Sequence, residues 1–211
     1  MEFKKIQLNG FKSFAEKTNF LIEKGLTGIV GPNGCGKSNI VESLRWCMGE
    51  TSAKSMRGSG MEDVIFSGTS NRPSKNISEV ALLLDNREKS GPIQYKEFDE
   101  ISIKRKIEKD KGSKYYINDK EVRARDVQTF FADLSTGAHS PSLISQGRIG
   151  QLVTAKPIER KSILEEAAGI SGIHARRQEA ETRLNAAENN LKRADELKRQ
   201  QQKQLDNLKK Q

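Results

Sequence analysis

The residues best suited to chemistry lie in one glycine-rich stretch, residues 31–38, whose letters read GPNGCGKS. The spacing is G-x-x-x-x-G-K-[ST], in which glycines let consecutive backbone N–H groups turn toward a phosphate. A helix that begins near Lys37 would add the positive end of its dipole. In such a loop Lys37 would reach the β- and γ-phosphates, and the Ser38 hydroxyl would hold Mg²⁺. The stretch therefore predicts a nucleotide phosphate site.

The residues on both sides of this loop are those that such a motif requires. Residues 26–30 (LTGIV) are mostly apolar and predict a strand, and residues 38–48 predict a helix. One apolar side of that helix would be formed by Ile40, Val41, Leu44 and Cys47. Because strand, loop and helix follow in this order, a chance match to the motif is a poor explanation.

Residues elsewhere in the chain could act on the same nucleotide. Arg57 lies in a Gly/Ser-rich segment, residues 49–60, where a cation would stabilise γ-phosphate charge, although an ordinary solvated arginine explains it equally well. Gln146 stands in a short loop after apolar residues, and in a P-loop protein such a glutamine can meet Mg²⁺ and the attacking water. Phe11 and Phe14 either cover a bound base or belong to the core.

Two stretches imitate ATPase motifs. Residues 79–85 (EVALLLD) predict a buried strand and end on an acid, as a Walker B element does, but Asn86 stands where a water-polarising Glu is expected. Residues 134–137 (LSTG) resemble an LSGG signature, which Ala138 breaks. Neither stretch supplies the acid or the signature that hydrolysis needs.

The composition bounds the kind of protein that carries this loop. The chain has 211 residues, a formal net charge of +9 and only 34% apolar residues, which is low for one compact core. The positive charge suits a polyanion such as DNA, but many surfaces share it. No apolar run is long enough for a membrane span, and the start has no secretory pattern. The two cysteines have no metal or redox spacing, which fits a reducing cytosol.

Further elements must position the loop. Alternating apolar residues predict strands at 3–8, 18–22 and 101–107, a hairpin over 114–122, and a helix over 126–134. A basic zone surrounds the later strands and consists of Lys104, Lys106, Lys109, Lys111, Lys114, Arg123 and Arg125. Such lysines serve solubility or contact DNA.

The composition changes from Pro157 onward. Pro157 at a first helical position and Glu159 in the first turn mark a helix start. A seven-residue repeat follows, with one core position at Ile170, Arg177, Leu184, Leu191, Lys198 and Leu205, and the other at Ile173, Ala180, Ala187, Ala194, Gln201 and Leu208. This pattern predicts a coiled coil whose partner helix is elsewhere, about 58 Å long from residue 173.

The order of P-loop lobe, glutamine loop and coiled coil resembles the N-terminal head half of bacterial SMC (structural maintenance of chromosomes) proteins. The matching stretches are residues 10–14 (GFKSF), 31–39, 57–58 (RG), 61–66 (MEDVIF), 144–148 (ISQGR) and 165–170 (EEAAGI). The resemblance implies an α/β fold: a P-loop ABC-type N-terminal head lobe with a mixed sheet over residues 1–156. A neck and the start of a long coiled-coil helix would occupy residues 157–211.

The resemblance also implies the site residues. Those expected to bind ATP are Lys12, Ser13, Pro32, Asn33, Gly34, Cys35, Gly36, Lys37, Ser38 and Asn39. Lys12 and Ser13 would lie near the adenine, Ser38 and Gln146 on Mg²⁺, and Arg57 would reach the γ-phosphate. In that family a C-terminal head lobe of the same full-length protein brings the signature, the Walker B Asp and the catalytic Glu. We therefore expect this chain alone to bind ATP without hydrolysing it.

The partners implied by the resemblance are a second SMC head, a kleisin subunit at the neck just after Gly172, and duplex DNA. The implied location is the cytoplasm at the nucleoid, and no membrane partner is expected. Two other functions fit parts of the sequence. A coiled-coil ATPase of double-strand-break repair shares the architecture, and a small P-loop kinase or GTPase would use Asp85 as its Walker B acid. An ABC transporter subunit is excluded because its signature should follow the glutamine loop within the same lobe.

Overall fold

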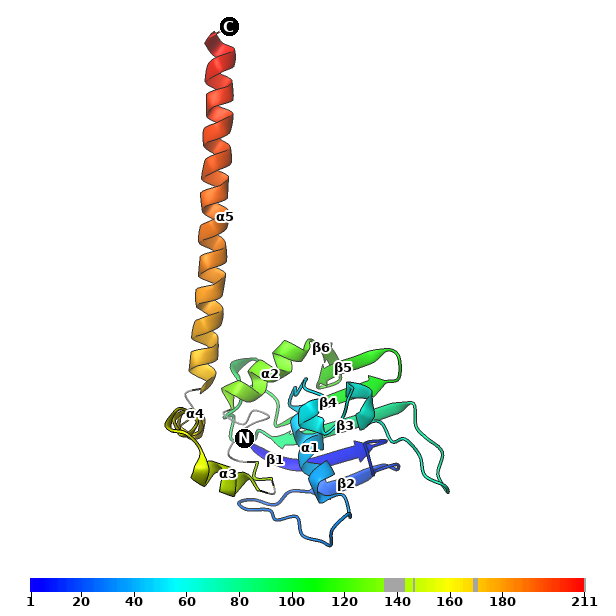
Figure 1. Ribbon diagram of the computed structural model, residues 1–211. Helices are drawn as coiled ribbons and strands as arrows, with labels where there is room; N and C mark the ends of the chain where they lie inside the picture. Colours follow the sequence, from blue (N-terminus) through cyan, green and yellow to red (C-terminus); the bar gives the residue numbers. More distant parts are fainter. Residues whose placement is uncertain (135–142, 146, 169–170, 211) are drawn as a thin grey trace. The chain divides into compact units, whose positions relative to one another are not determined.

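A computed structural model describes residues 1–134, 143–145, 147–168 and 171–210. The chain forms two compact units, Met1–Gly172 and Ile173–Gln211. The first unit contains a six-stranded sheet in the order β2-β1-β3-β4-β5-β6 (Figure 1). The strands are β1 (Glu2–Asn9), β2 (Thr18–Leu21), β3 (Ile77–Asp85), β4 (Glu100–Glu108), β5 (Gly112–Ile117) and β6 (Lys120–Val122). The predicted α/β fold class is confirmed, as are the strands predicted at these positions.

The helices of the described residues also agree with the sequence pattern. They are α1 (Lys37–Cys47), α2 (Ala124–Asp133), α3 (Arg148–Thr154), α4 (Pro157–Ala167) and α5 (Ser171–Lys210), with 3₁₀ turns η1 (Lys54–Met56), η2 (Met61–Val64) and η3 (Ile93–Tyr95). The helix after the glycine-rich loop, the helix near residue 126 and the start at Pro157 are confirmed. The short helix α3 has no counterpart among the predictions.

The core lies on one face of the sheet. Leu82 of β3 is opposite Ile103 of β4, which is opposite Ile117 of β5, and all three side chains are buried. Helix α1 packs over β3 and β4 and helix α2 over β5, so apolar helix faces cover this apolar side (Figure 1). Trp46 of α1 and Phe131 of α2 are fully buried. Burial of these side chains fixes α1, which begins directly after the glycine-rich loop, against the sheet.

The other face of the sheet is polar and basic. Lys106 of β4 is opposite Glu79 of β3 and Lys114 of β5, and Lys104 is opposite Tyr116. All of these side chains retain solvent exposure, as the period-two alternation of strands requires. The predicted basic zone therefore lies partly on this face.

The predicted strand over residues 26–30 is wrong. These residues make no strand pairing, and Leu26 and Val30 are 95% and 92% exposed. A strand needs a hydrogen-bonding neighbour, and both edges of β1 are already taken, by β2 and β3. Each described pairing of the sheet is antiparallel, and a parallel pairing, which the expected mixed sheet would also contain, is not among them.

The second unit is part of α5, a helix of 40 residues and so about 60 Å long. Leu184, Leu191 and Leu205, which share one predicted seam position, are 60%, 68% and 46% exposed. No second helix accompanies them within described residues 173–210. The long helix is confirmed, whereas its pairing and the domain boundary at residues 156 and 157 stay predictions. Among the described residues, no helix has the length and apolarity of a membrane span.

Candidate nucleotide-binding site

The glycine-rich loop contains two residues with left-handed backbone, Gly34 and Gly36, at φ of 82° and 93°. Residues with a Cβ avoid this region. At Gly36 the space is restricted as well, because a Cβ there would lie 2.9 Å from the Ser13 Oγ. The tight turn delivers the chain directly into α1, which begins at Lys37.

The first turn of α1 presents backbone N–H groups without a side-chain cap. Its N-cap residue is Gly36, which has no side chain to offer, and the first turn contains no acidic residue. The N-terminal N–H groups of a helix have no acceptor within the helix, and they carry the positive end of the dipole. An uncapped N-terminus at the end of a glycine-rich loop suits an anion such as phosphate.

Lys37 folds back across the loop that precedes it. Its Nζ donates to the carbonyl oxygens of Gly31 at 2.6 Å and Pro32 at 2.5 Å, and lies 3.8 Å from the Cys35 Sγ. An ammonium held over the loop is positioned to meet the oxygens of a phosphate that the loop surrounds. Residues 31–35 and Ser38 retain solvent exposure, so such a phosphate would reach them from solvent.

Four predicted site residues from separate parts of the chain meet beside this helix. The Asn39 Nδ2 donates to the Ser13 Oγ at 2.9 Å, and the Arg57 Nη2 donates to the Asn39 Oδ1 at 2.8 Å. Arg57 also pairs through Nε with Glu42, whose other carboxylate oxygen pairs with the Lys12 Nζ. The structure thus joins Lys12 and Arg57 through one carboxylate that was not predicted, and Arg57 extends the network to Asn39 and Ser13.

Glu42 was not predicted as a site residue because its partners are far away along the chain. It is 7% exposed and lies three residues after Asn39 in α1. Residues three apart share a helix face, so a carboxylate three residues beyond the loop's last asparagine was the available signal.

The remaining predicted residues are placed as follows. Gln146 lies outside the described residues, as do residues 135–137 of the LSTG stretch. Ser145, which precedes Gln146, accepts a hydrogen bond from the Arg45 Nη2 of α1 at 3.2 Å. Phe11 is fully buried against Trp46, with ring centres 5.5 Å apart, so of its two alternatives the core position is confirmed.

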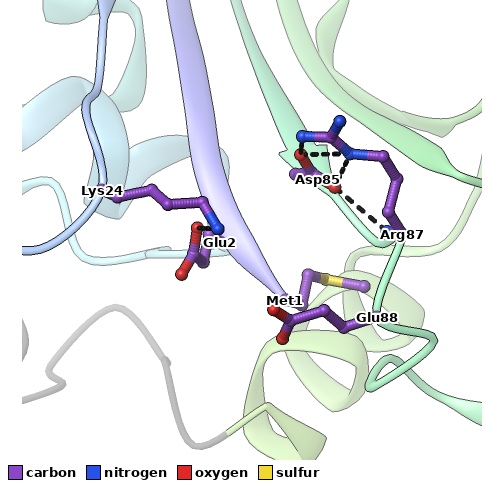
Figure 2. Close-up of a pocket in the computed structure, with 6 residues that line it drawn as sticks. All are labelled: Met1, Glu2, Lys24, Asp85, Arg87 and Glu88. Carbon is purple, nitrogen blue, oxygen red and sulfur yellow. Dashed lines mark hydrogen bonds and ion pairs between the residues drawn. The ribbon is translucent and has the colours of Figure 1, made fainter.

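Asp85 lies at the opposite end of β1 from the loop. It is opposite Glu2, whereas Lys12 and Ser13 follow the far end of this eight-residue strand, roughly 23 Å away at 3.3 Å per residue. Asp85 lines a cavity of about 330 Å³ together with Met1, Glu2, Lys24, Arg87 and Glu88 (Figure 2). Hydrogen bonds from Arg87 hold the pKa of the Asp85 carboxyl well below its usual range. Its rejection as a Walker B acid agrees with this position.

Residues 2–148 of the chain match the model of the RecF/RecN/SMC N terminal domain. The chain belongs to this SMC-containing family. The match covers the sheet, the loop and α1, and ends at the first residue of α3. The resemblance inferred from the motifs is thereby confirmed.

Known SMC proteins are similar over the whole chain. "Chromosome partition protein Smc" of Rhodopseudomonas palustris is 55% identical over 211 residues, which is 100% of this chain and 18% of the relative. The chain therefore spans less than a fifth of the length of this relative. A structure described as "Structural biochemistry of ATP-driven dimerization and DNA stimulated activation of SMC ATPases" is 31% identical at a TM-score of 0.67, and covers 79% of this chain and 99% of that one.

A second SMC structure extends the similarity beyond the sheet. It is an Smc head domain from Pyrococcus furiosus with an extended coiled coil, bound to the C-terminal domain of ScpA. It is 32% identical at a TM-score of 0.72 and covers 93% of this chain and 49% of that one. The likeness to a head with a coiled coil supports the predicted P-loop ABC-type head fold.

Proposed function

We propose that this chain is the ATP-binding half of an SMC chromosome condensation and segregation ATPase, which engages DNA through ATP-driven dimerisation of heads. The observation that carries the proposal is Lys37, whose ammonium lies across the glycine-rich loop at the uncapped N-terminus of α1. Identity of 55% to a chromosome partition protein over the whole chain favours this process over double-strand-break repair.

The residues present fit a magnesium nucleotide. Mg²⁺ keeps most of its waters and takes one or two protein ligands plus phosphate oxygens. Ser38 offers a hydroxyl in the first turn of α1, and the described residues contain no cluster of three His, Cys, Asp or Glu that would form a separate metal site. Ser38 and Gln146 would hold the ion, which would neutralise charge on the β- and γ-phosphate oxygens.

The proposed partners follow from the described relatives. One SMC structure is named for ATP-driven dimerisation and DNA stimulation, and another contains the ScpA C-terminal domain. For this chain we propose a C-terminal head lobe of the same full-length protein, a second head, a kleisin at the neck helices after Gly172, and duplex DNA. The proposed location is the cytoplasm, at the nucleoid.

Titration calorimetry with MgATP tests the proposal. The wild-type chain should bind, and Lys37→Ala should abolish measurable binding, since a hydrogen bond to a charged group contributes about 1.5–3 kcal/mol and Lys37 would make more than one to the phosphates. Lys96→Ala serves as the control, because Lys96 is exposed and lies outside the loop network. Equal MgATP affinity in wild type and Lys37→Ala, when circular dichroism shows that both are folded, would contradict the assignment of the phosphate site to the loop.

A further inference from the structure

The network beside α1 contains one residue that the predicted phosphate contacts do not account for, the buried Glu42. Its side chain is 9% exposed, and its two oxygens pair with different cations, Lys12 and Arg57. A buried carboxylate persists where its charge is paired. Since each oxygen pairs with a protein cation, and a carboxylate repels the like charge of a phosphate, Glu42 acts on those two cations.

The contacts of Arg57 fix the orientation of its guanidinium. Nε pairs with Glu42 and Nη2 donates to the Asn39 Oδ1 at 2.8 Å, so one edge of the planar group is held against the first turns of α1. A guanidinium carries five N–H donors. Among the described residues, contacts with Glu42 and Asn39 account for two of them, the Nε–H and one N–H of Nη2, which leaves three for a ligand.

Lys12 holds the backbone next to Arg57. Its Nζ donates to the Met56 carbonyl at 2.5 Å while it pairs with Glu42, and its side chain is 14% exposed. Arg57 itself has left-handed backbone, with φ of 53°, and so does Lys12, at 46°. Non-glycine residues keep this conformation where surrounding contacts over-determine it. Glu42 therefore fixes Arg57 twice, directly through the guanidinium and indirectly through Lys12.

We propose that Glu42 is a positioning residue, which holds Arg57 beside the first turn of α1 so that its remaining N–H groups meet a nucleotide phosphate. The inference rests on the proposed ATP-binding function of the loop. An arginine whose side chain is 57% exposed would otherwise lose much rotamer freedom on contacting a ligand. Holding it in advance removes that cost from binding.

A double-mutant cycle between Glu42 and Arg57 tests this role. We expect Glu42→Gln to weaken MgATP affinity of the chain by about three- to tenfold, and Arg57→Ala by a similar factor. The combined variant should bind within about twofold of Arg57→Ala, because Glu42 acts through Arg57. In nitrogen NMR the Arg57 Nε–H signal should exchange faster with water in Glu42→Gln.

Glu50→Gln is the matched control. Glu50 is also 7% exposed and lies just beyond the other end of α1, where its Oε1 accepts from the Ser52 N–H at 2.8 Å. It should change MgATP affinity by less than about twofold whatever it does to the melting temperature. Should Glu42→Gln unfold the chain, the same cycle of Glu42→Gln and Arg57→Ala is repeated in a Lys12→Met background, where replacing Glu42 leaves no lysine ammonium without its partner.

The outcomes separate the two proposals. An unchanged affinity in Glu42→Gln, or effects that add fully with those of Arg57→Ala, would overturn the positioning role while leaving ATP binding intact. Absence of MgATP binding by the folded wild-type chain would overturn the proposed function itself.

Discussion

The guanidinium of Arg105 lies 4.4 Å from the ring centre of Trp46, and its Nη1 donates to the Trp46 carbonyl at 2.7 Å. The same nitrogen donates to the Glu50 carbonyl at 2.6 Å, and the group also lies over the Tyr115 ring. Arg105 is 3% exposed and stands among the inward positions of β4. It therefore closes the C-terminal end of α1, opposite the end that carries the loop.

Replacing this arginine should destabilise the first unit. Arg105→Met removes the side-chain donor from the carbonyl oxygens of Trp46, which keeps the Gly49 N–H, and of Glu50, just beyond α1, and should cost about 2–4 kcal/mol in free energy of unfolding. Urea denaturation checks this as a lower midpoint at an unchanged slope. Arg87→Met is the control, since Arg87 is exposed and solvent screens its surface pair with Asp85. Equal midpoints for the two variants would contradict the role of Arg105.

The two left-handed glycines of the loop should respond differently to alanine. Gly34→Ala meets open space and should cost about 1–2 kcal/mol in free energy of unfolding, from backbone conformation alone. Gly36→Ala should cost more, because its Cβ would lie 2.9 Å from the Ser13 Oγ and 3.4 Å from the Phe14 ring. Urea denaturation measures both variants.

A compensating change checks the cause of that difference. Ser13→Ala removes the crowding oxygen, so the combined Ser13→Ala, Gly36→Ala variant should lose less stability than the two single changes added together. Simple additivity would mean that the contact with Ser13 is not what distinguishes Gly36 from Gly34.

The sequence predicts what is local and misses what depends on distant partners. The helix that follows residues 31–36 was predicted correctly because a few consecutive residues determine it. The strand at residues 26–30 failed because a strand needs a neighbour, and no local pattern shows that β1 is already paired on both sides.

Two of the buried charged residues, Glu42 and Arg105, were not predicted for a related reason. Alternation along β4 places residue 105 on the inside together with Ile103 and Ile107. No residue near Arg105 in the sequence indicates that the Trp46 carbonyl accepts a hydrogen bond from its guanidinium. Glu42 likewise depends on Lys12, 30 positions earlier. Charged residues at inward positions of a helix or strand are thus signals of a distant partner.

Asp85 should take no part in nucleotide binding. Asp85→Asn is expected to leave MgATP affinity within about twofold of wild type, since the carboxylate lies at the other end of β1 and is paired with Arg87. Calorimetry measures it. A large decrease in affinity would restore Asp85 as the acid of a complete small P-loop enzyme.

The same carboxylate should titrate below its ordinary pKa of 3.8, because hydrogen bonds from Arg87 favour the charged form. A lowered pKa means that the folded chain binds the proton less well than the unfolded one. The resulting stabilisation is present above about pH 3.8 and is lost as the pH falls through the folded value. Carbon NMR of the Asp85 carboxyl should show the low midpoint, and Arg87→Ala should raise it toward 3.8.

Duplex DNA should bind weakly, without sequence preference, to the basic zone. Lys104, Lys111 and Lys114 pair with Asp119, Glu108 and Glu121, whereas within the described residues no ion pair engages Lys106 or Lys109. Reversing Lys106 and Lys109 to Glu should therefore weaken DNA binding. The slope of log affinity against log salt should become shallower by about one for each phosphate that the variant no longer neutralises.

The control for this measurement must change the net charge equally. Lys17 and Lys96 are exposed lysines outside the basic zone, so reversing both alters the total charge by the same amount. Fluorescence anisotropy at several salt concentrations compares the two double variants. An equal decrease in affinity for both would mean that overall charge, and no particular surface, attracts the DNA.

This chain alone should bind MgATP without turning it over. Hydrolysis needs a carboxylate that orients water at the γ-phosphate. In the described network beside the loop the carboxylate is Glu42, and Lys12 and Arg57 occupy its two oxygens. Asp85 is paired with Arg87 at the far end of β1 and is followed by Asn86, which is buried and bonded through its amide to the carbonyls of Tyr95 and Phe98.

A steady-state phosphate-release assay should therefore give no Lys37-dependent rate for the purified chain. Adding a separately produced C-terminal lobe, with the missing acid and a helix to pair with Leu184 and Leu191, should restore turnover that Lys37→Ala abolishes. Lys37-dependent turnover by the chain alone would instead identify a complete P-loop enzyme.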